Sequence, residues 1–500
     1  MPKESRVSPF VKQCFVTCTV GLNIVGTGCV LGYPAILLPQ LQSPESTITI
    51  SSQAASWIAS ITAVMMLIGS LVVAPIMDRF GRKIAHYAVT LPAIVGWGII
   101  IVANNFPTIF IGRILGGLSF GMLFSLRSVL IGEYTSPKNR GAFLTTVSLT
   151  QAFGIFFVHL IGSLMTWTMT AVVCVLFSIA SLIMIFFCPE SPSWLASRGK
   201  YDESRKVFRW LRGNEEEDEL EEMIQARILI RKAKTPENKK INRFRRMLIT
   251  IRKKEFYKPI TLMVHANIMV NFAGGTIMAA YSTVILGLML GPEANVHFWM
   301  IVLDTQRIIF NAGAIYVINK TKRRTMMFLT GGLCVLSSLA IALYAYMKDQ
   351  GLMTYNSLWI PVILINVNYF TVATGMVPLP NVIAGEVFPL EYKSIAGMIS
   401  IWAAAAFMFT ALKTFPGLIE GVGLHGTYVV YSAILFYNLV VIWFLLPETK
   451  GRTLQEIEDE FRGRPLAREE REARMSLEMD PIVAFKRKES ERRCSVPLLS

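Results

Sequence analysis

Acidic and basic residues form two similar sets, one in each half of the 500-residue chain. The first set consists of Asp78, Arg82, Lys83, Glu133, Arg140 and Glu190. The second set follows the same order and consists of Arg323, Arg324, Glu386, Lys393 and Glu448. In both sets one glutamate has a base seven residues later, and the last glutamate follows a proline. This recurrence indicates that the chain is duplicated.

Carboxylates and cations in such sets can form ion pairs that open and close. A single exposed pair contributes only about 0 to 1 kcal/mol. A partly desolvated network between helix ends is stronger, and it can hold one side of two helix bundles together while a central site stays in place. The two sets would then form a gate for alternating access. The alternative is that the charges only anchor helix ends and set the orientation in a membrane.

Two further charges lie inside an apolar stretch. Arg307 is about ten residues into the stretch 296–318, where a charge is costly and usually faces a cavity or a partner. Asp304 is three residues earlier on the same helix face and can neutralise it. Arg307 is therefore either a contact for a substrate, such as an anionic or unusual glycoside, or half of a structural pair with Asp304.

The remaining residues do not indicate a catalytic site or a metal site. Arg127 lies near one end of its stretch, where a long cationic side chain is expected to snorkel toward the membrane surface. The histidines lack the spacing of metal ligands, so we expect them to be structural: His86, His159, His265, His297 and His425. No nucleophile or phosphate motif stands in a plausible setting. We expect no metal, no cofactor and no enzyme activity.

The composition shows what kind of element must position these residues. The chain is 53% hydrophobic and only 17% charged, with a mean hydropathy of +0.48. An average soluble domain is about 25% charged, so a soluble enzyme is disfavoured. High hydrophobicity excludes a disordered chain, and seven cysteines in this length do not indicate a disulfide scaffold.

A membrane core requires roughly 20 apolar residues in a helix, and twelve such stretches occur. They are 13–40, 54–77, 84–104, 107–131, 142–165, 167–188, 257–290, 296–318, 325–347, 356–384, 393–416 and 424–446. The predicted fold class is an all-α membrane protein with twelve transmembrane helices in two six-helix halves. The predicted segments are an N-terminus (1–12), a first bundle (13–188), a helical linker (189–256), a second bundle (257–446) and a tail (447–500).

The basic residues predict the orientation. Outside the spans, Lys and Arg lie almost entirely in the breaks on one side, and the other side has only Lys348 and Lys413. Because basic residues are retained in the cytoplasm, we expect both termini to be cytoplasmic in a multi-pass cell-membrane protein. The net charge of +15 then reflects orientation and contact with membrane lipid rather than nucleic-acid binding.

Five motifs resemble those of the sugar porters of the major facilitator superfamily. They are GSLVVAPIMDRFGRK (69–83), the element from Glu133 to Arg140-Gly141, PESPSWL (189–195), GEVFP (385–389) and PETKGRTLQEIE (447–458). The resemblance covers about residues 12–460, and the stretch 41–61 is similar to insect facilitated trehalose and glucose transporters. It implies the major facilitator fold, sugar transport, and a cytoplasmic gate built from the two charged sets. Asn319 and Lys322 replace an acid and a glycine of the family, so the second half of the gate is expected to be weaker or differently wired.

The resemblance also implies a set of substrate contacts: Gln151, Asn271, Thr276, Arg307, Asn381 and Trp402. Sugar recognition needs amides and hydroxyls for the substrate hydroxyls and an aromatic face for the ring. Gln151 and Trp402 match the family, whereas the other four positions depart from it. Because discrimination between hydroxyl-bearing substrates depends on matched buried donors and acceptors, these departures weaken a generic sugar assignment.

The first span bears on energy coupling. Proton-coupled members of the family place an Asp after a Gly-Tyr pair, whereas this chain has Gly32-Tyr33-Pro34 and no acid from 5 to 44. We therefore predict a plasma-membrane uniporter that carries a sugar such as trehalose or glucose by facilitated diffusion, with no obligate protein partner. The alternatives are a transporter of a non-sugar or anionic organic solute and a non-transporting nutrient sensor.

Overall fold

The computed structural model describes residues 8–214, 216–233, 253–352, 358–389, 393–452 and 454–465, which are almost entirely helical. The long helices of the first half are α1 (Pro9–Gln42), α2 (Ser52–Phe80), α3 (Arg82–Ile101), α4 (Phe106–Tyr134), α5 (Pro137–Leu164) and α6 (Trp167–Phe187). The second half contains α11 (Lys254–Phe272), α12 (Gly275–Leu290), α13 (Val296–Lys320), α14 (Arg323–Asp349), α15 (Trp359–Thr371), η1 (Val372–Met376), α16 (Pro378–Val387) and α17 (Lys393–Leu445). Four short helices lie outside the spans, namely α7 (Pro192–Ser197), α8 (Tyr201–Arg212), α9 (Glu217–Ala233) and α18 (Leu454–Arg462). Most of the predicted tail, 466–500, is outside the described residues.

The twelve predicted spans are all present. In the described chain, eleven helical segments are long and apolar enough to cross a membrane. The last of these, Ile395–Leu445, is kinked at Gly423, whose φ of 70° is not helical. This segment therefore contains the two predicted spans 393–416 and 424–446, and the predicted twelve-helix fold is confirmed.

Two spans predicted as continuous are interrupted in the second half. The stretch 257–290 is divided into α11 and α12 at Gly274, which has a φ of 103°. The stretch 356–384 is divided by the π-helix η1, which is followed by Pro378. Irregular backbone at membrane depth is tolerated where it is buried in protein or lines a cavity, so these breaks mark the interior of the second half.

Polar residues at the loops explain where several helices begin. The side chains of Ser51, Asn105 and Asn295 accept hydrogen bonds from the backbone N–H groups three residues later. These N–H groups have no partner within their own helix, so such caps stabilise a helix start by roughly 1 kcal/mol. The capped helices are α2, α4 and α13.

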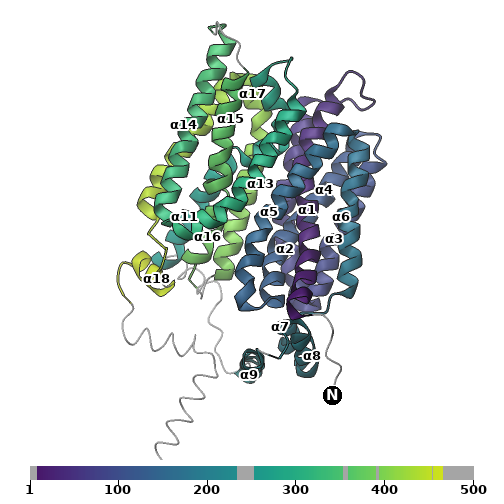
Figure 1. The fold of residues 1–500 in the computed structure, drawn as a ribbon, viewed down its shortest axis with the longest axis vertical. Coiled ribbons are helices and arrows are strands. Elements are labelled where there is room, and N and C mark those ends of the chain that lie inside the picture. The colour runs from purple at the N-terminus through teal and green to yellow at the C-terminus, as the bar shows by residue number, and fades with distance from the viewer. Residues whose placement is uncertain are drawn as a thin grey trace, which may run out of the picture.

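The two halves stand side by side, with α1–α6 in one and α11–α17 in the other (Figure 1). The short helices α7, α8, α9 and α18 lie at one end of the molecule. We call this end the linker side; Arg82 and Arg323, which begin α3 and α14, belong to it. The other end is called the opposite side.

The halves contact each other through α2 with α17, α5 with α13 and α1 with α12. On the opposite side, Lys413 Nζ donates to Ser56 Oγ at 2.7 Å, and the rings of Trp57 and Phe409 lie 5.9 Å apart. Thr283 Oγ1 also donates across the boundary to a backbone oxygen of α1 at 2.8 Å. The structure therefore shows the halves joined at the opposite side.

Candidate functional site

The first charged set forms a cluster at the linker side. Arg82 donates from Nε and Nη2 to the two carboxylate oxygens of Glu133, each at 2.8 Å. The hydroxyl of Ser191 donates to the same carboxylate. Both charged side chains are largely buried, with 15% and 18% of their surface exposed. This two-pronged contact joins the start of α3 to the end of α4 with more geometric specificity than a single ion pair has.

Glu190 completes this cluster by capping a helix. Its carboxylate accepts from the backbone N–H of Arg82 at 2.8 Å and of Lys83 at 3.2 Å. The first N–H groups of a helix lack internal partners, and the helix dipole favours a negative charge there. Gly81 precedes the helix with a φ of 100°, and a Cβ at this position would lie 2.3 Å from Glu190 Oε2. A glycine is therefore needed for this carboxylate to reach α3.

The second charged set repeats this arrangement, except that its arginine contacts a single carboxylate oxygen. Arg323 donates from Nη2 and Nε to Glu386 Oε1 at 3.0 and 3.3 Å, and Thr449 Oγ1 donates to Oε2 at 2.6 Å. Glu448 accepts from the backbone N–H of Arg323 at 3.0 Å and of Arg324 at 3.2 Å. Glu448 therefore caps α14 as Glu190 caps α3.

The second half of the gate, expected to be weaker or differently wired, differs in one contact: Arg323 reaches a single oxygen of Glu386, and at longer distances than Arg82 has in the first cluster. Lys322, which takes the place of a family glycine, is exposed at the N-cap position of α14 and leaves the cluster geometry intact. In the first half, Ser193, which stands where the family usually has Arg, accepts from Arg227 Nη2 at 3.4 Å. The two clusters thus preserve the same core of one arginine, two glutamates and one hydroxyl.

The surroundings of Glu448 favour its ionised form. Partial burial acts to raise the pKa of this carboxyl, because a charge is less stable away from water. Hydrogen bonds from four backbone N–H groups outweigh this effect and lower the pKa below its ordinary value; they come from Lys450, Arg323, Arg324 and Thr449. At neutral pH, Glu448 therefore places a negative charge at the start of α14.

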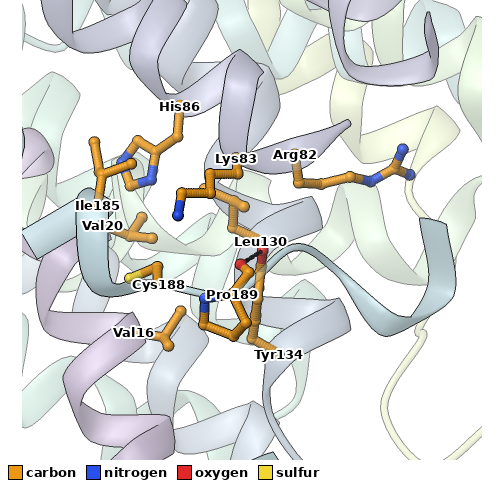
Figure 2. Close-up of a pocket in the computed structure, with 10 residues that line it drawn as sticks. All are labelled: Val16, Val20, Arg82, Lys83, His86, Leu130, Tyr134, Ile185, Cys188 and Pro189. Carbon is orange, nitrogen blue, oxygen red and sulfur yellow. Dashed lines mark hydrogen bonds between the residues drawn. The ribbon is translucent and has the colours of Figure 1, made fainter. Parts of the chain in front are cut away.

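Lys83 and Arg324 lie beside the clusters and contact the ends of other helices. Lys83 Nζ donates to Phe186 O at 2.9 Å, and Arg324 Nη2 donates to Trp443 O at 3.0 Å. Figure 2 shows Lys83 beside a small cavity also lined by His86, while the side chain of Arg82 points away from it. Both cations therefore tie α3 and α14 to the last helix of their own half.

Three other predicted gate residues are outside these contacts. Asp78 is exposed, and its backbone oxygen accepts from Trp194 Nε1 at 3.1 Å. Arg140 Nη2 donates to Thr135 O at 3.4 Å, and Lys393 is exposed. On the linker side, the ion pairs that can be described each join residues of one half or of its adjoining short helices. The expectation that the sets hold the two halves together is therefore not met in this state.

Three of the predicted substrate contacts are at least partly accessible. Gln151 on α5 is half-buried, and its Oε1 lies 3.5 Å from Arg127 Nη1. Asn381 on α16 is exposed, and Trp402 on α17 is half-buried. These side chains can offer amide groups and an aromatic face to a solute.

The other two uncharged candidates, Asn271 and Thr276, flank the break between α11 and α12. Thr276 Oγ1 donates to Asn271 Oδ1 at 3.4 Å, and Asn271 Nδ2 donates to Asn267 O at 2.9 Å. Asn271 is only 4% exposed. Its amide is therefore engaged within the second half, and a substrate could use it only by replacing these bonds.

The pair between Asp304 and Arg307, one of the two alternatives for Arg307, is not formed. Asp304 Oδ2 lies 2.5 Å from His159 Nδ1, which belongs to α5 of the other half. Arg307 Nη1 instead donates to the hydroxyl of Tyr369 on α15 at 3.2 Å. The spacing of the two residues along α13 made a pair within this helix plausible. In the structure each of them instead has a partner on another helix.

Comparison with known proteins identifies this architecture. Residues 13–461 match the family described as "Sugar (and other) transporter". The chain belongs to this sugar (and other) transporter family. The matched region includes both charged clusters, from Arg82 to Glu448.

The relatives of this chain include insect proteins named "Facilitated trehalose transporter Tret1". That of Drosophila virilis is 26% identical over 451 residues, which are 90% of this chain and 48% of the relative. That of Bombyx mori is 24% identical over 446 residues, which are 89% of this chain and 86% of the relative. The chain thus spans about half the length of the Drosophila relatives that it matches.

Solved structures show the same fold. An inward-open structure of the xylose transporter XylE from E. coli has a TM-score of 0.70 at 17% identity, covering 91% of this chain and 100% of that chain. XylE bound to 6-bromo-6-deoxy-D-glucose has a TM-score of 0.68, also at 17% identity, with the same coverage. The predicted membership in the sugar porters of the major facilitator superfamily is confirmed, and the matched proteins are transporters rather than enzymes.

Reasoning from the sequence missed several residues of these sites. Ser191 and Thr449 both donate to a cluster carboxylate, and the recurring Pro-Glu-Ser and Pro-Glu-Thr triplets were the signal for them. His159, grouped with the structural histidines, was marked by its isolation in the apolar run 155–161. Arg127 was expected to snorkel toward the membrane surface. Its Nη1 instead lies 3.5 Å from Gln151 Oε1, and its Cζ lies 4.2 Å from the ring centroid of Phe124.

Proposed function

We propose that this sugar transporter carries a sugar such as trehalose or glucose across the plasma membrane by facilitated, uncoupled diffusion. The linker side faces the cytoplasm, and both termini lie there. The observation that carries this proposal is the repetition of one Arg–Glu–Glu cluster, with Arg82 in the first half and Arg323 in the second, on the same side of the molecule.

The clusters make each half suited to move as a unit. The contacts of Arg82 and Glu190 join the ends of α3, α4 and α6, and the corresponding contacts join the ends of α14, α16 and α17. The halves are joined on the opposite side through Lys413 and Ser56. Alternating access would break this junction and close the linker side while the substrate site stays between the halves.

Two considerations support a sugar and uncoupled transport. The insect relatives are named for facilitated trehalose transport, and Gln151, Asn381 and Trp402 offer groups suited to a polyhydroxylated ring. The first span has Gly32-Tyr33-Pro34 and no carboxylate from 5 to 44, where proton-coupled members of the family place an Asp.

Uptake by the purified full-length protein in liposomes tests this proposal. We expect saturable uptake of radiolabelled glucose or trehalose that stops at the outside concentration, whether or not a pH gradient is applied. Accumulation above that concentration in a pH gradient would show coupling. Absence of flux for both sugars, with a folded protein, would exclude this substrate class and favour the nutrient-sensor alternative.

The surroundings of Arg307 support a second candidate, an anionic organic solute. Its half-buried guanidinium lies within a span and has a tyrosine hydroxyl as its described partner, while Asp304 is paired elsewhere. Such charges usually face a cavity or a partner. Inhibition of labelled glucose uptake by glucuronate, a sugar acid, tests this candidate. If the carboxylate of the solute contacts the guanidinium of Arg307, glucuronate should inhibit the native protein about tenfold more strongly than Arg307→Asn. Equal inhibition of the two proteins would exclude an anionic solute at this residue.

A further inference from the structure

One buried imidazole connects the two halves of the protein. His159 on α5 and Asp304 on α13 are 0% and 4% exposed, and Nδ1 and Oδ2 are 2.5 Å apart. The other ring nitrogen, Nε2, lies 3.1 Å from Gly32 O of α1 and 3.2 Å from Ala279 O of α12. A Cβ at Gly32 would lie 2.7 Å from Val158 Cγ1 and 3.1 Å from Nε2, so a glycine gives α5 the room for this approach. His159 therefore contacts three other helices, two of them in the other half.

These contacts determine how many protons the pair holds. Backbone oxygens only accept hydrogen bonds, so Nε2 of His159 must carry a hydrogen. A neutral imidazole protonated at Nε2 presents a lone pair at Nδ1, which would repel an ionised carboxylate at 2.5 Å. A proton must therefore lie between Nδ1 and Oδ2. Whichever atom carries it, the pair holds one proton more than a neutral histidine and an ionised aspartate.

The other titratable groups around the pair are bases, phenols and the thiols of Cys29 and Cys174. On α13 these are His297, which interacts electrostatically with His159, and Arg307. From the other elements packed here come Tyr369 of α15, Tyr33 of α1, Tyr281 of α12 and Arg113 of α4. The hydroxyls of Tyr33 and Tyr281 donate to Trp167 O and Leu412 O, and Arg113 donates to Val30 O. In the described surroundings, Asp304 is thus the carboxylate that meets His159.

We propose that His159 and Asp304 form a proton-binding site between the halves, and that the bound proton stabilises the state in which the opposite side is joined. Separation of the halves there would leave His159 with Gly32 of its own half, while Asp304 and Ala279 move away. Water would then solvate both side chains. A solvated imidazole that has lost its carboxylate partner holds the extra proton less tightly. The separated state therefore binds fewer protons than the joined state.

The direction of the pH effect follows from this difference. Two states that differ by one bound proton change their ratio about tenfold per pH unit, and acid favours the state that binds the proton. Acidification of the opposite side therefore favours the joined state, and the ratio of separated to joined protein rises with pH. Because the pair is buried in the joined state, the proton enters and leaves from the opposite side. It regulates the exchange between states and is not carried across.

Distances between the halves test this proposal without a transported substrate. Spin labels attached to a keto amino acid at Glu45 and Val422, both exposed on the opposite side, would report separation in the full-length protein in lipid nanodiscs. We expect the fraction with the long distance to rise with pH, by up to about tenfold per pH unit while the joined state predominates. A ratio that does not change up to about pH 8.5 would overturn the proposal.

Two variants and a control identify the responsible pair. In Asp304→Asn the amide can donate to Nδ1 of a neutral imidazole, so the contact forms without the extra proton and the pH dependence should disappear. His159→Gln removes the titrating ring and should have the same effect, which keeps the test valid if one variant fails to fold. Asp349→Asn is the matched control, because Asp349 forms a pair with His425 at 3.1 Å that is exposed and lies within the second half. A native pH dependence in a folded Asp304→Asn or His159→Gln protein, or its loss in the control, would contradict the assignment.

Discussion

Glu190 and Glu448 stabilise helices that lie far from them in the sequence. Each carboxylate accepts the first backbone N–H groups of a helix that begins more than a hundred residues earlier in the chain. An ordinary N-cap residue lies directly before its own helix. These glutamates therefore act both as caps and as links between the last span of a half and its third span.

Replacement of Glu448 by Gln tests this role at the residue scale. The amide is uncharged, so the hydrogen bonds at the start of α14 weaken, and we expect a loss of about 1 to 2 kcal/mol in the free energy of unfolding at neutral pH. Because folding lowers the pKa of Glu448, its stabilisation is present above the ordinary glutamate range and is lost as pH falls through the lowered pKa.

Thermal unfolding as a function of pH measures this effect. The native protein should lose stability in acid, and the part of this loss due to Glu448 should be missing in Glu448→Gln. Glu293→Gln provides the control, since Glu293 is exposed in the loop before α13. Identical stability of Glu448→Gln and the native protein at neutral pH would show that the carboxylate is not needed as a cap.

The residue-scale predictions succeeded where the sequence repeats and failed where partners are distant. Arg82, Glu133 and Glu190 could be selected because the second half has the same residues in the same order. A pair of Asp304 with Arg307 was one of the two predicted alternatives, because three residues along a helix place side chains on neighbouring positions. The actual partner of Asp304, His159, is 145 positions away, and spacing along one helix contains no information about it.

At the scale of elements, hydropathy was sufficient for the spans but not for their breaks. The predicted spans agree with the observed helices to within a few residues at most ends, because about 20 apolar residues are needed to cross a membrane. The break at Gly274 and the π-helix Val372–Met376 were not predicted. Both depend on backbone conformation at a few residues, to which hydropathy averaged over a span is insensitive.

The contact between α2 and α17 leads to a prediction at this scale. Lys413 of α17 donates to Ser56 and lies 4.3 Å from the ring centroid of Trp57, both on α2. Its replacement by Ala removes a hydrogen bond of about 1 kcal/mol and a cation–π contact of about 0.5 to 1 kcal/mol. We expect the ratio of separated to joined protein to rise by roughly tenfold, measured as the distance between the labels at Glu45 and Val422.

Lys348 provides the matched control for this variant. It lies on the same side of the molecule, but its Nζ donates to Leu288 O at 2.9 Å and Met289 O at 3.0 Å within the second half. Lys348→Ala should therefore leave the distance between the halves unchanged. An equal effect of both variants would mean that loss of positive charge on this side, and not the α2–α17 contact, controls the state.

At the scale of the whole molecule, the two clusters have separate roles in this state and a shared role in the proposed opposite state. Here each cluster holds the helix ends of its own half, and the halves meet at the opposite side. Closure of the linker side would bring the ends of α4 and α16 toward each other, and the clusters with them. A contact that forms only when the linker side is closed affects the rate of transport. It does not affect the stability of the state described here.

A double-mutant cycle of Arg82→Gln and Arg323→Gln separates these two roles. Each variant leaves a largely buried glutamate without its arginine, so we expect a loss of about 1 to 3 kcal/mol in stability. Because the two arginines are in different halves and share no described partner, their effects on thermal unfolding should add to within about 0.5 kcal/mol. Arg79→Gln, at an exposed position on the same side, should change neither stability nor transport.

Transport by the same four proteins should not follow this additivity. If the clusters meet when the linker side closes, loss of either arginine already removes the contact between them, so the second replacement has little left to remove. We therefore expect sugar uptake by the double variant to be close to that of the slower single variant. An uptake rate reduced by the product of the two single reductions would show that the clusters never act together, and each would then serve only its own half throughout the transport cycle.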